Sequence, residues 1–151
     1  MTIENNLKKL NIELPKAPDP VGSYVAVAVA GDLIFISGQV SFNKDGKLIK
    51  GKIGKELNLE QGQEAAKFCA LNLLAQLKKI CGSLDKVKSC VKITGYVNST
   101  DSFVDQPKIV NGASDLISQI FGDNGKHTRA AVSTNSLPLG AAVEVDGIFE
   151  I

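Results

Sequence analysis

The longest regular pattern of hydrophobic and polar positions has a helical period. Between about Leu59 and Cys81, apolar residues recur every three or four positions. They are Ala66, Cys69, Ala70, Leu73, Leu77 and Ile80. Asn58, followed three residues later by Gln61, resembles a capping box, and Gly82 is typical of a helix end. The pattern predicts one long helix with an apolar side.

Two further helices are predicted. One begins at Val104 or Lys108 and ends at Phe121, because Leu116, Ile117, Ile120 and Phe121 form an apolar side before the turn at 122–125. The other is short and covers residues 2–12, with Thr2 as its cap. Three prolines within six residues, in the segment 14–20, then exclude regular structure.

Alternation with period two predicts the strands. They are Tyr24–Val29, Leu33–Gln39, Lys88–Asn98, Arg129–Thr134 and Ala141–Asp146. A turn at 31–32 makes the first two a hairpin, and a turn at 137–140 predicts a tight connection between the last two. The segment 47–50 is a short edge strand weakened by its lysines. The order of elements is typical of the α+β class, with two helices packed on one face of a mixed β-sheet.

Composition narrows the class of protein. A chain of 151 residues with 44% hydrophobic content can bury one core, so residues 1–151 are expected to form a single domain. The net charge of +1 and the absence of a Lys/Arg block argue against nucleic acid as an obligatory partner. No apolar run approaches the ~20 residues that cross a bilayer, and the first ten residues contain no apolar signal core. A cytoplasmic protein without a membrane partner is expected.

The cysteines predict no metal site. Cys69, Cys81 and Cys90 have no CxxC spacing, and His127 is the only histidine, so few soft ligands are available. Cys69 and Cys81 fall in or beside the apolar stripe of the long helix, which is typical of packing residues. Reduced and mostly buried thiols are expected. A thiol nucleophile would need a base, which His127 could supply.

Arg129 is the residue with the most suggestive chemistry. It is the only arginine, since every other strongly basic residue is lysine, and it enters an apolar strand. A guanidinium group suits a planar carboxylate better than an ammonium group does. The alternative is a surface arginine or one paired with an acidic residue.

Five features in order resemble the YjgF-like, or RidA, family of reactive-intermediate deaminases. They are Pro20–Tyr24, the strand end Ser37–Gln39, Asn111, Arg129, and Glu144 fifteen positions after Arg129 and beyond Leu137–Pro138. The resemblance extends from about residue 18 to the end, which leaves residues 1–17 as an N-terminal extension. It implies a chorismate-mutase-like fold and a homotrimer whose ligand sites lie between subunits.

The resemblance also implies a chemistry, the hydrolysis of imines or enamines such as 2-aminoacrylate to 2-keto acids and ammonia. Arg129 would hold the substrate carboxylate, and Glu144 would orient the attacking water. Tyr24, Ser37, Gly38 and Asn111 would line the cleft. No metal or organic cofactor is implied, because the imine carbon is already electrophilic. The small-molecule partner would be an imino or keto acid.

Each of these residues also has a structural interpretation. Tyr24 can begin a strand, Ser37–Gly38 can form a bulge, Asn111 can cap a helix, and Glu144 can be a solvent-facing strand residue. The sequence also departs from the family pattern at Ala131, where deaminase members commonly have Cys. A non-catalytic, metabolite-sensing carboxylate binder therefore stands beside the deaminase hypothesis. An endoribonuclease comes last, because no basic stripe interleaved with aromatics is present.

Overall fold

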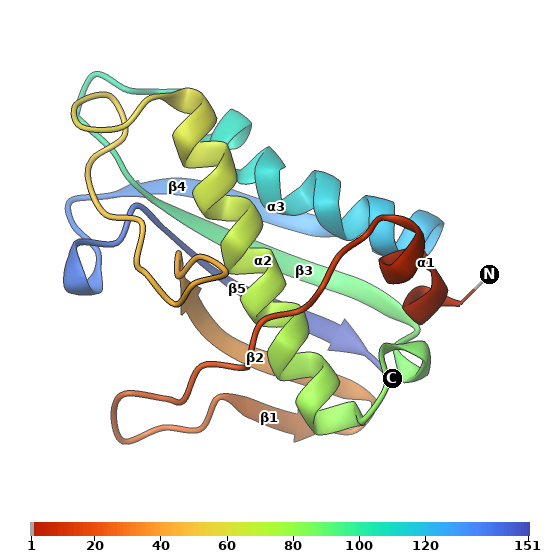
Figure 1. Cartoon of the computed structure of the whole chain (residues 1–151). Helices are drawn as coiled ribbons and strands as arrows, with labels where there is room; N and C mark the ends of the chain where they lie inside the picture. Colours follow the sequence, from red (N-terminus) through yellow and green to blue (C-terminus); the bar gives the residue numbers. More distant parts are fainter. Residues whose placement is uncertain (1) are drawn as a thin grey trace.

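The structure, a computed structural model, describes residues 2–151 and consists of one five-stranded sheet with helices on one face (Figure 1). The strand order is β1-β2-β5-β3-β4, and only β3 and β4 are parallel neighbours. The strands are β1 (Val27–Ala30), β2 (Leu33–Val40), β3 (Ser89–Asn98), β4 (Thr128–Thr134) and β5 (Val143–Glu150). The predicted α+β class with a mixed sheet is confirmed.

Two long helices, α2 (Leu59–Cys81) and α3 (Gln106–Phe121), lie side by side across the sheet. The capping box of α2 is present, since Asn58 and Gln61 exchange side-chain to backbone hydrogen bonds of 2.9 Å, and Gly82 is its C-cap. The two helices approach closely at Gly112, where a Cβ would lie 2.0 Å from the carbonyl oxygen of Gln63. The predicted long helix is thus confirmed at both ends.

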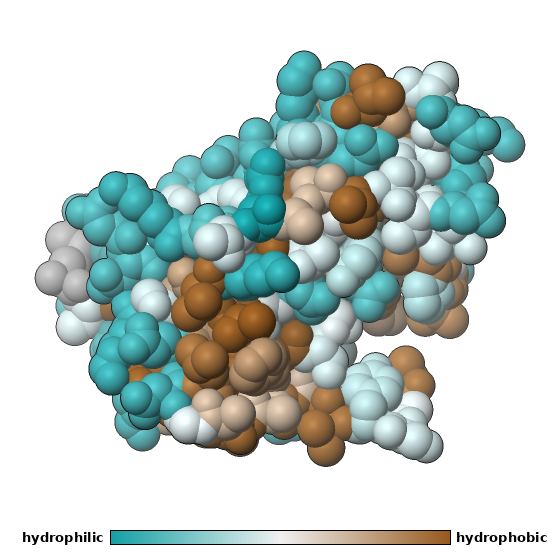
Figure 2. Space-filling view, turned by 180° about the vertical axis from the view of Figure 1, so that it is seen from behind, coloured by the Kyte–Doolittle hydropathy of each residue, from teal (hydrophilic) through white to brown (hydrophobic). Residues whose placement is uncertain are grey.

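The two faces of the sheet differ in character. Along β5, Val143, Val145 and Phe149 are buried against the helices, while Glu144 and Asp146 are half-buried and point to the other face. No helix of residues 2–151 covers that second face in Figure 1. Figure 2 views it directly and shows apolar surface gathered over one part of it. We call this uncovered side the open face.

Two sequence predictions about strands were wrong. The strands at Arg129 and Glu144 do not pair with each other, because β3 lies between β4 and β5. The connection between β4 and β5, which contains the 3-10 helix η3 (Pro138–Gly140), therefore crosses over the end of β3 and does not close a hairpin. The segment 47–50 forms only isolated bridges, Phe42 with Leu48 and Lys50 with Ala141, and no strand.

The N-terminal segment packs onto the helical layer. Helix α1 (Ile3–Lys9) is capped by the Thr2 hydroxyl, as predicted, and ends before residue 12. Leu7 joins the core, and the Asn6 side chain donates to the carbonyl oxygen of Ile120 in α3. Helix α1 is therefore a third helix in the helical layer, packed against α3.

Candidate functional site

Arg129 lies on β4 and points toward α3. It stands beside Ile93 in the parallel β3–β4 register, and Ile93 is buried beneath the helices, so both side chains lie on the helical face. One guanidinium nitrogen, Nη1, donates to Asn111 Oδ1 at 2.7 Å and to Ser114 Oγ at 3.1 Å. Among residues 2–151, no carboxylate lies within ion-pair distance of Arg129. Arg129 is therefore not paired with an acidic residue of the described structure, and that alternative was wrong.

Asn111 lies in the second turn of α3, on the side that meets β4. The helix begins at Gln106, with Asp105 as its N-cap, so the interpretation of Asn111 as a helix cap is wrong. Its amide oxygen instead accepts the shortest bond that Arg129 makes. Asn111 thus belongs to the surroundings of Arg129.

Two further residues complete this group, and neither was singled out as part of it from the sequence. Ser114, one helical turn after Asn111, is 2.9 Å from His127 Nε2, and His127 Nδ1 is 2.6 Å from the carbonyl oxygen of Gly125. The spacing of three residues between Asn111 and Ser114 could have indicated a shared helix face. The contact with His127 could not have been read from the sequence.

Glu144 is surrounded differently, on the open face. It lies over a bulge in β2, where the register with β5 shifts between Ile36 and Gln39. The bulge predicted for Ser37–Gly38 is therefore present. A Cβ at Gly38 would lie only 2.1 Å from Glu144 Oε1, so the glycine makes room for the carboxylate. Burial raises the pKa of Glu144, and the neighbouring Asp146 raises it further.

A cavity of about 340 Å³ opens beside Glu144. Gly38 and Tyr24 line it, together with apolar residues that include Val21 and Leu139. The Tyr24 hydroxyl accepts a bond from the backbone N–H of Val21 at 3.4 Å, so Tyr24 braces the loop before β1. The Ser37 hydroxyl donates to the carbonyl oxygen of Val25 at 2.7 Å, and Ser37 lines a neighbouring hollow of about 650 Å³ on the open face.

The six residues predicted for the site therefore form two groups. Arg129 and Asn111 lie on the helical face at the sheet edge, whereas Tyr24, Ser37, Gly38 and Glu144 lie on or beside the open face. The strand β3 separates the two groups within one chain. Within one chain, the side chains of Arg129 and Glu144 therefore lie on opposite faces of the sheet.

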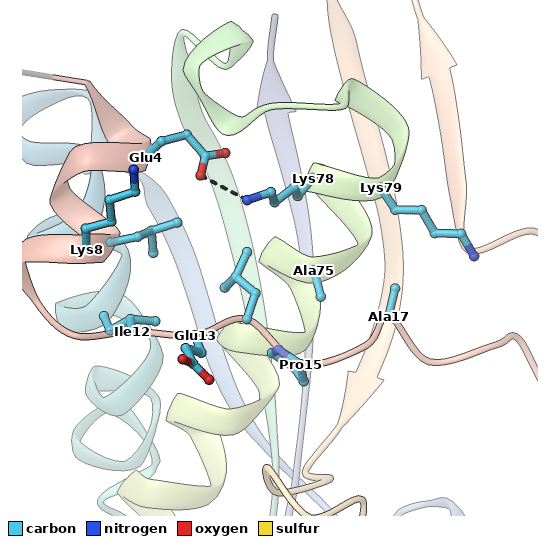
Figure 3. Close-up of a pocket in the computed structure, with 11 residues that line it drawn as sticks. Glu4, Lys8, Ile12, Glu13, Pro15, Ala17, Ala75, Lys78 and Lys79 are labelled. Atoms are coloured by element: carbon cyan, nitrogen blue, oxygen red, sulfur yellow. Dashed lines mark hydrogen bonds and ion pairs between the residues drawn. The ribbon is translucent and has the colours of Figure 1, made fainter.

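A third cavity, of about 590 Å³, lies between α2 and the N-terminal segment and contains none of the predicted residues (Figure 3). On its wall, Glu4 forms a 2.9 Å ion pair with Lys78 and accepts the backbone N–H of Leu84 at 3.0 Å. These contacts fasten α1 to α2 and to the start of η1 (Leu84–Lys86).

The thiols lie away from reactive surroundings. Cys69, Cys81 and Cys90 are unpaired, and Cys69 and Cys90 are buried, as expected. Burial raises the pKa of Cys90 to about 12 and that of Cys69 well above its usual value. A thiolate nucleophile is therefore disfavoured at both positions.

Comparison with known proteins gives consistent matches over the whole chain. Residues 4–150 match the family model described as "YjgF/chorismate_mutase-like, putative endoribonuclease". Protein TCP17 of Trypanosoma cruzi is 44% identical over 147 residues, which cover 97% of this chain and 92% of that protein. The crystal structure of a "putative endoribonuclease" from Shewanella oneidensis is 32% identical, with full coverage of both chains and a TM-score of 0.96. The 2-iminobutanoate/2-iminopropanoate deaminase of Dermatophagoides farinae is 26% identical over 141 residues, 93% of this chain and 94% of that protein.

Proposed function

Because the chain belongs to the YjgF/chorismate mutase-like family, we propose that it is a cofactor-free deaminase that hydrolyses 2-imino acids and their enamine tautomers. The products are 2-keto acids and ammonia. The deaminase of Dermatophagoides farinae supports this choice among the activities named for relatives. The substrate class is a small carboxylate, and the sites lie between copies of the chain.

The observation that carries the proposal is the unpaired guanidinium of Arg129. Both N–H groups of Nη1 are taken by the neutral acceptors Asn111 and Ser114, which hold the guanidinium without neutralising it. Among the described residues, no partner takes the edge formed by Nε–H and Nη2–H, and these two N–H groups are parallel. Such an edge matches the two oxygens of a carboxylate. Arg129 is therefore suited to anchor a 2-imino acid.

Glu144 is suited to activate the attacking water. Its carboxylate is half-buried beside a cavity of about 340 Å³, and burial together with Asp146 raises its pKa toward the range of a useful general base. In the reaction, water adds to the imine carbon and gives a carbinolamine. Proton transfer to nitrogen and cleavage of the C–N bond then release ammonia and leave the ketone. Glu144 would take the proton from water and pass it on.

The separation of Arg129 and Glu144 supports an oligomer. The two residues face opposite sides of the sheet, so one chain offers two incomplete halves of a site. The open face also carries exposed apolar side chains, including Phe35 at 41% exposure, which lines the hollow of about 650 Å³, and Val132 at 44%. Figure 2 shows apolar surface gathered over part of this face. Contact between copies would cover these side chains. A homotrimer is the assembly implied by the family resemblance.

The test is turnover of a freshly generated 2-imino acid, made in the assay by an amino-acid oxidase, with release of the 2-keto acid followed spectroscopically. The proposal expects that added protein accelerates this release beyond the buffer-catalysed rate and that Arg129→Ala abolishes the acceleration. Light scattering during size exclusion is expected to return three times the chain mass of 16.0 kDa. A monomer at micromolar concentration would contradict the site between copies.

A second candidate function is a metabolite sensor that binds the same carboxylate without turnover. The observation that favours it is Ala131, on β4 close to Arg129, where deaminase relatives commonly have Cys. The hydrolytic steps above require no thiol, so Ala131 does not remove a needed group. Binding of a 2-keto acid without acceleration of imine hydrolysis would favour the sensor.

A further inference from the structure

The hydrogen bonds around Arg129 form a chain whose direction can be assigned. A guanidinium group only donates, so Arg129 Nη1 donates to Ser114 Oγ over 3.1 Å. The carbonyl oxygen of Gly125 only accepts, so His127 Nδ1 must carry a proton and donate to it over 2.6 Å. Both ends of the chain are thereby fixed.

The middle of the chain follows from the two ends. Ser114 Oγ already accepts from Arg129, and His127 Nε2 lies 2.9 Å from it, within reach of the Ser114 hydroxyl proton. With Nδ1 protonated, a neutral histidine has an unprotonated Nε2 that accepts this proton. Every group in the chain is satisfied when His127 is neutral and carries its proton on Nδ1. If the single proton were on Nε2 instead, the unprotonated Nδ1 would face the carbonyl oxygen of Gly125, and two acceptors would oppose each other.

We propose that Ser114 and His127 are positioning residues that hold the guanidinium of Arg129 with its Nε–Nη2 edge directed at the ligand carboxylate. Ser114 occupies one N–H of Nη1 and Asn111 the other, which stops the guanidinium from presenting Nη1 to the ligand. His127 fixes the direction of the Ser114 hydroxyl, and Gly125 fixes the proton on His127. The nature of the ligand rests on the proposed function, whereas the hydrogen-bond chain does not.

The amino-acid composition makes this hydrogen-bond network directly observable by nuclear magnetic resonance. Arg129 is the only arginine and His127 the only histidine, so their side-chain nitrogen signals need no assignment in nuclear magnetic resonance spectra of uniformly labelled protein. Long-range proton–nitrogen correlations are expected to show a proton on His127 Nδ1, which donates to the Gly125 carbonyl oxygen. The Arg129 Nε–H signal is expected to be sharp and slow to exchange with water.

Four variants separate positioning from general support of the fold. Ser114→Ala and His127→Leu remove a member of the chain, whereas Ser114→Thr keeps a hydroxyl and His127→Gln keeps an acceptor near the position of Nε2. The first pair is expected to broaden the Arg129 signal and to weaken binding of 2-oxobutanoate about five- to twentyfold, about the net contribution of one or two hydrogen bonds. The second pair is expected to restore most of both. Ser118→Ala, one turn further along α3, is the control and should change neither.

A double-mutant cycle gives a readout that a merely structural role would not move. With Arg129→Lys as the background, Ser114→Ala is expected to cause no further loss of binding, because the planar group that Ser114 orients is gone. An equal loss in both backgrounds would overturn the proposal. So would a His127 Nδ1 without a proton, or an Arg129 signal unchanged in Ser114→Ala. If these spectra agree with the proposal but neither a 2-keto acid nor an imine is recognised, the proposed function fails and the positioning inference stands.

Discussion

Replacing Gly38 by alanine is expected to disable the site while leaving the fold intact. Gly38 lies in the β2 bulge directly beneath Glu144. Its φ angle is not among the positive values found at other glycines, so alanine is compatible with the backbone there. The substitution therefore tests the space that glycine leaves for the Glu144 carboxylate, and not a turn conformation.

The expected magnitude follows from the distances. The new Cβ would lie 2.1 Å from Glu144 Oε1, 2.9 Å from Cδ and 3.1 Å from Cγ. Non-bonded heavy atoms are most stable at about 3.5–4.0 Å, so the carboxylate oxygen must move by at least about 1.4 Å. A misplacement of about 1 Å at a reacting group costs roughly a hundredfold in rate. We expect kcat to fall by about that factor.

The stability of the protein should change little. The Glu144 side chain is half-buried, and a rotation can carry its carboxylate away from the new methyl group. Replacing glycine by alanine also restricts the unfolded chain, which stabilises the folded state by about 0.4–1 kcal/mol. The two effects oppose each other, so the free energy of unfolding should stay within about 1 kcal/mol of the parent value.

The assay compares the rate of imine hydrolysis with a denaturant titration for the parent, Gly38→Ala, Glu144→Gln and the double variant. If both substitutions act on the position of the Glu144 carboxylate, the double variant should be about as slow as Glu144→Gln alone. Parent-like turnover in Gly38→Ala would refute the reasoning, because the carboxylate would then have moved without consequence. A large loss of stability would show instead that the bulge itself cannot accept a side chain.

Three other predictions concern separate parts of the molecule. Arg129→Lys should weaken 2-keto acid binding, measured by calorimetry, about ten- to a hundredfold, because the planar two-point contact of roughly 1.5–3 kcal/mol is lost. Unchanged affinity would show that another residue binds the carboxylate. Glu144→Gln should lower kcat with little effect on binding. In the parent protein, kcat/KM should fall when acidification protonates Glu144, because the protonated carboxyl group cannot act as a base. Since the pKa of Glu144 is raised, this fall should begin above the usual glutamate pKa. A fall only at the usual glutamate pKa would contradict the role of Glu144 as general base. Gly112→Ala should lower the free energy of unfolding by about 3 kcal/mol in a denaturant titration, because its Cβ would meet the Gln63 carbonyl oxygen at 2.0 Å. As a control, Asp115→Ala on the exposed side of α3 should change the free energy of unfolding little.

The local pattern of the sequence was enough to predict most of the elements. The period of the apolar residues, the Asn58–Gln61 cap and Gly82 define α2, because capping and amphipathic packing depend on residues only a few positions apart. The bulge at Ser37–Gly38 was also predicted as one of two interpretations, and the register shift of β2 confirms it. The family resemblance and the one-sided α+β arrangement needed no further information.

Only the tertiary structure decided how these elements meet. The tight turn at 137–140 predicted neighbouring strands, but β3 pairs with both β4 and β5 and lies between them. This insertion is a long-range pairing that no local pattern records, and the registers of the two pairings place Arg129 and Glu144 on opposite faces of the sheet. The contact of Ser114 with His127 has the same origin, since it depends on the docking of α3 beside β4. The sequence singled out Arg129, Asn111 and Glu144 as candidates, but only the tertiary structure showed that they fall into two groups on opposite faces of the sheet.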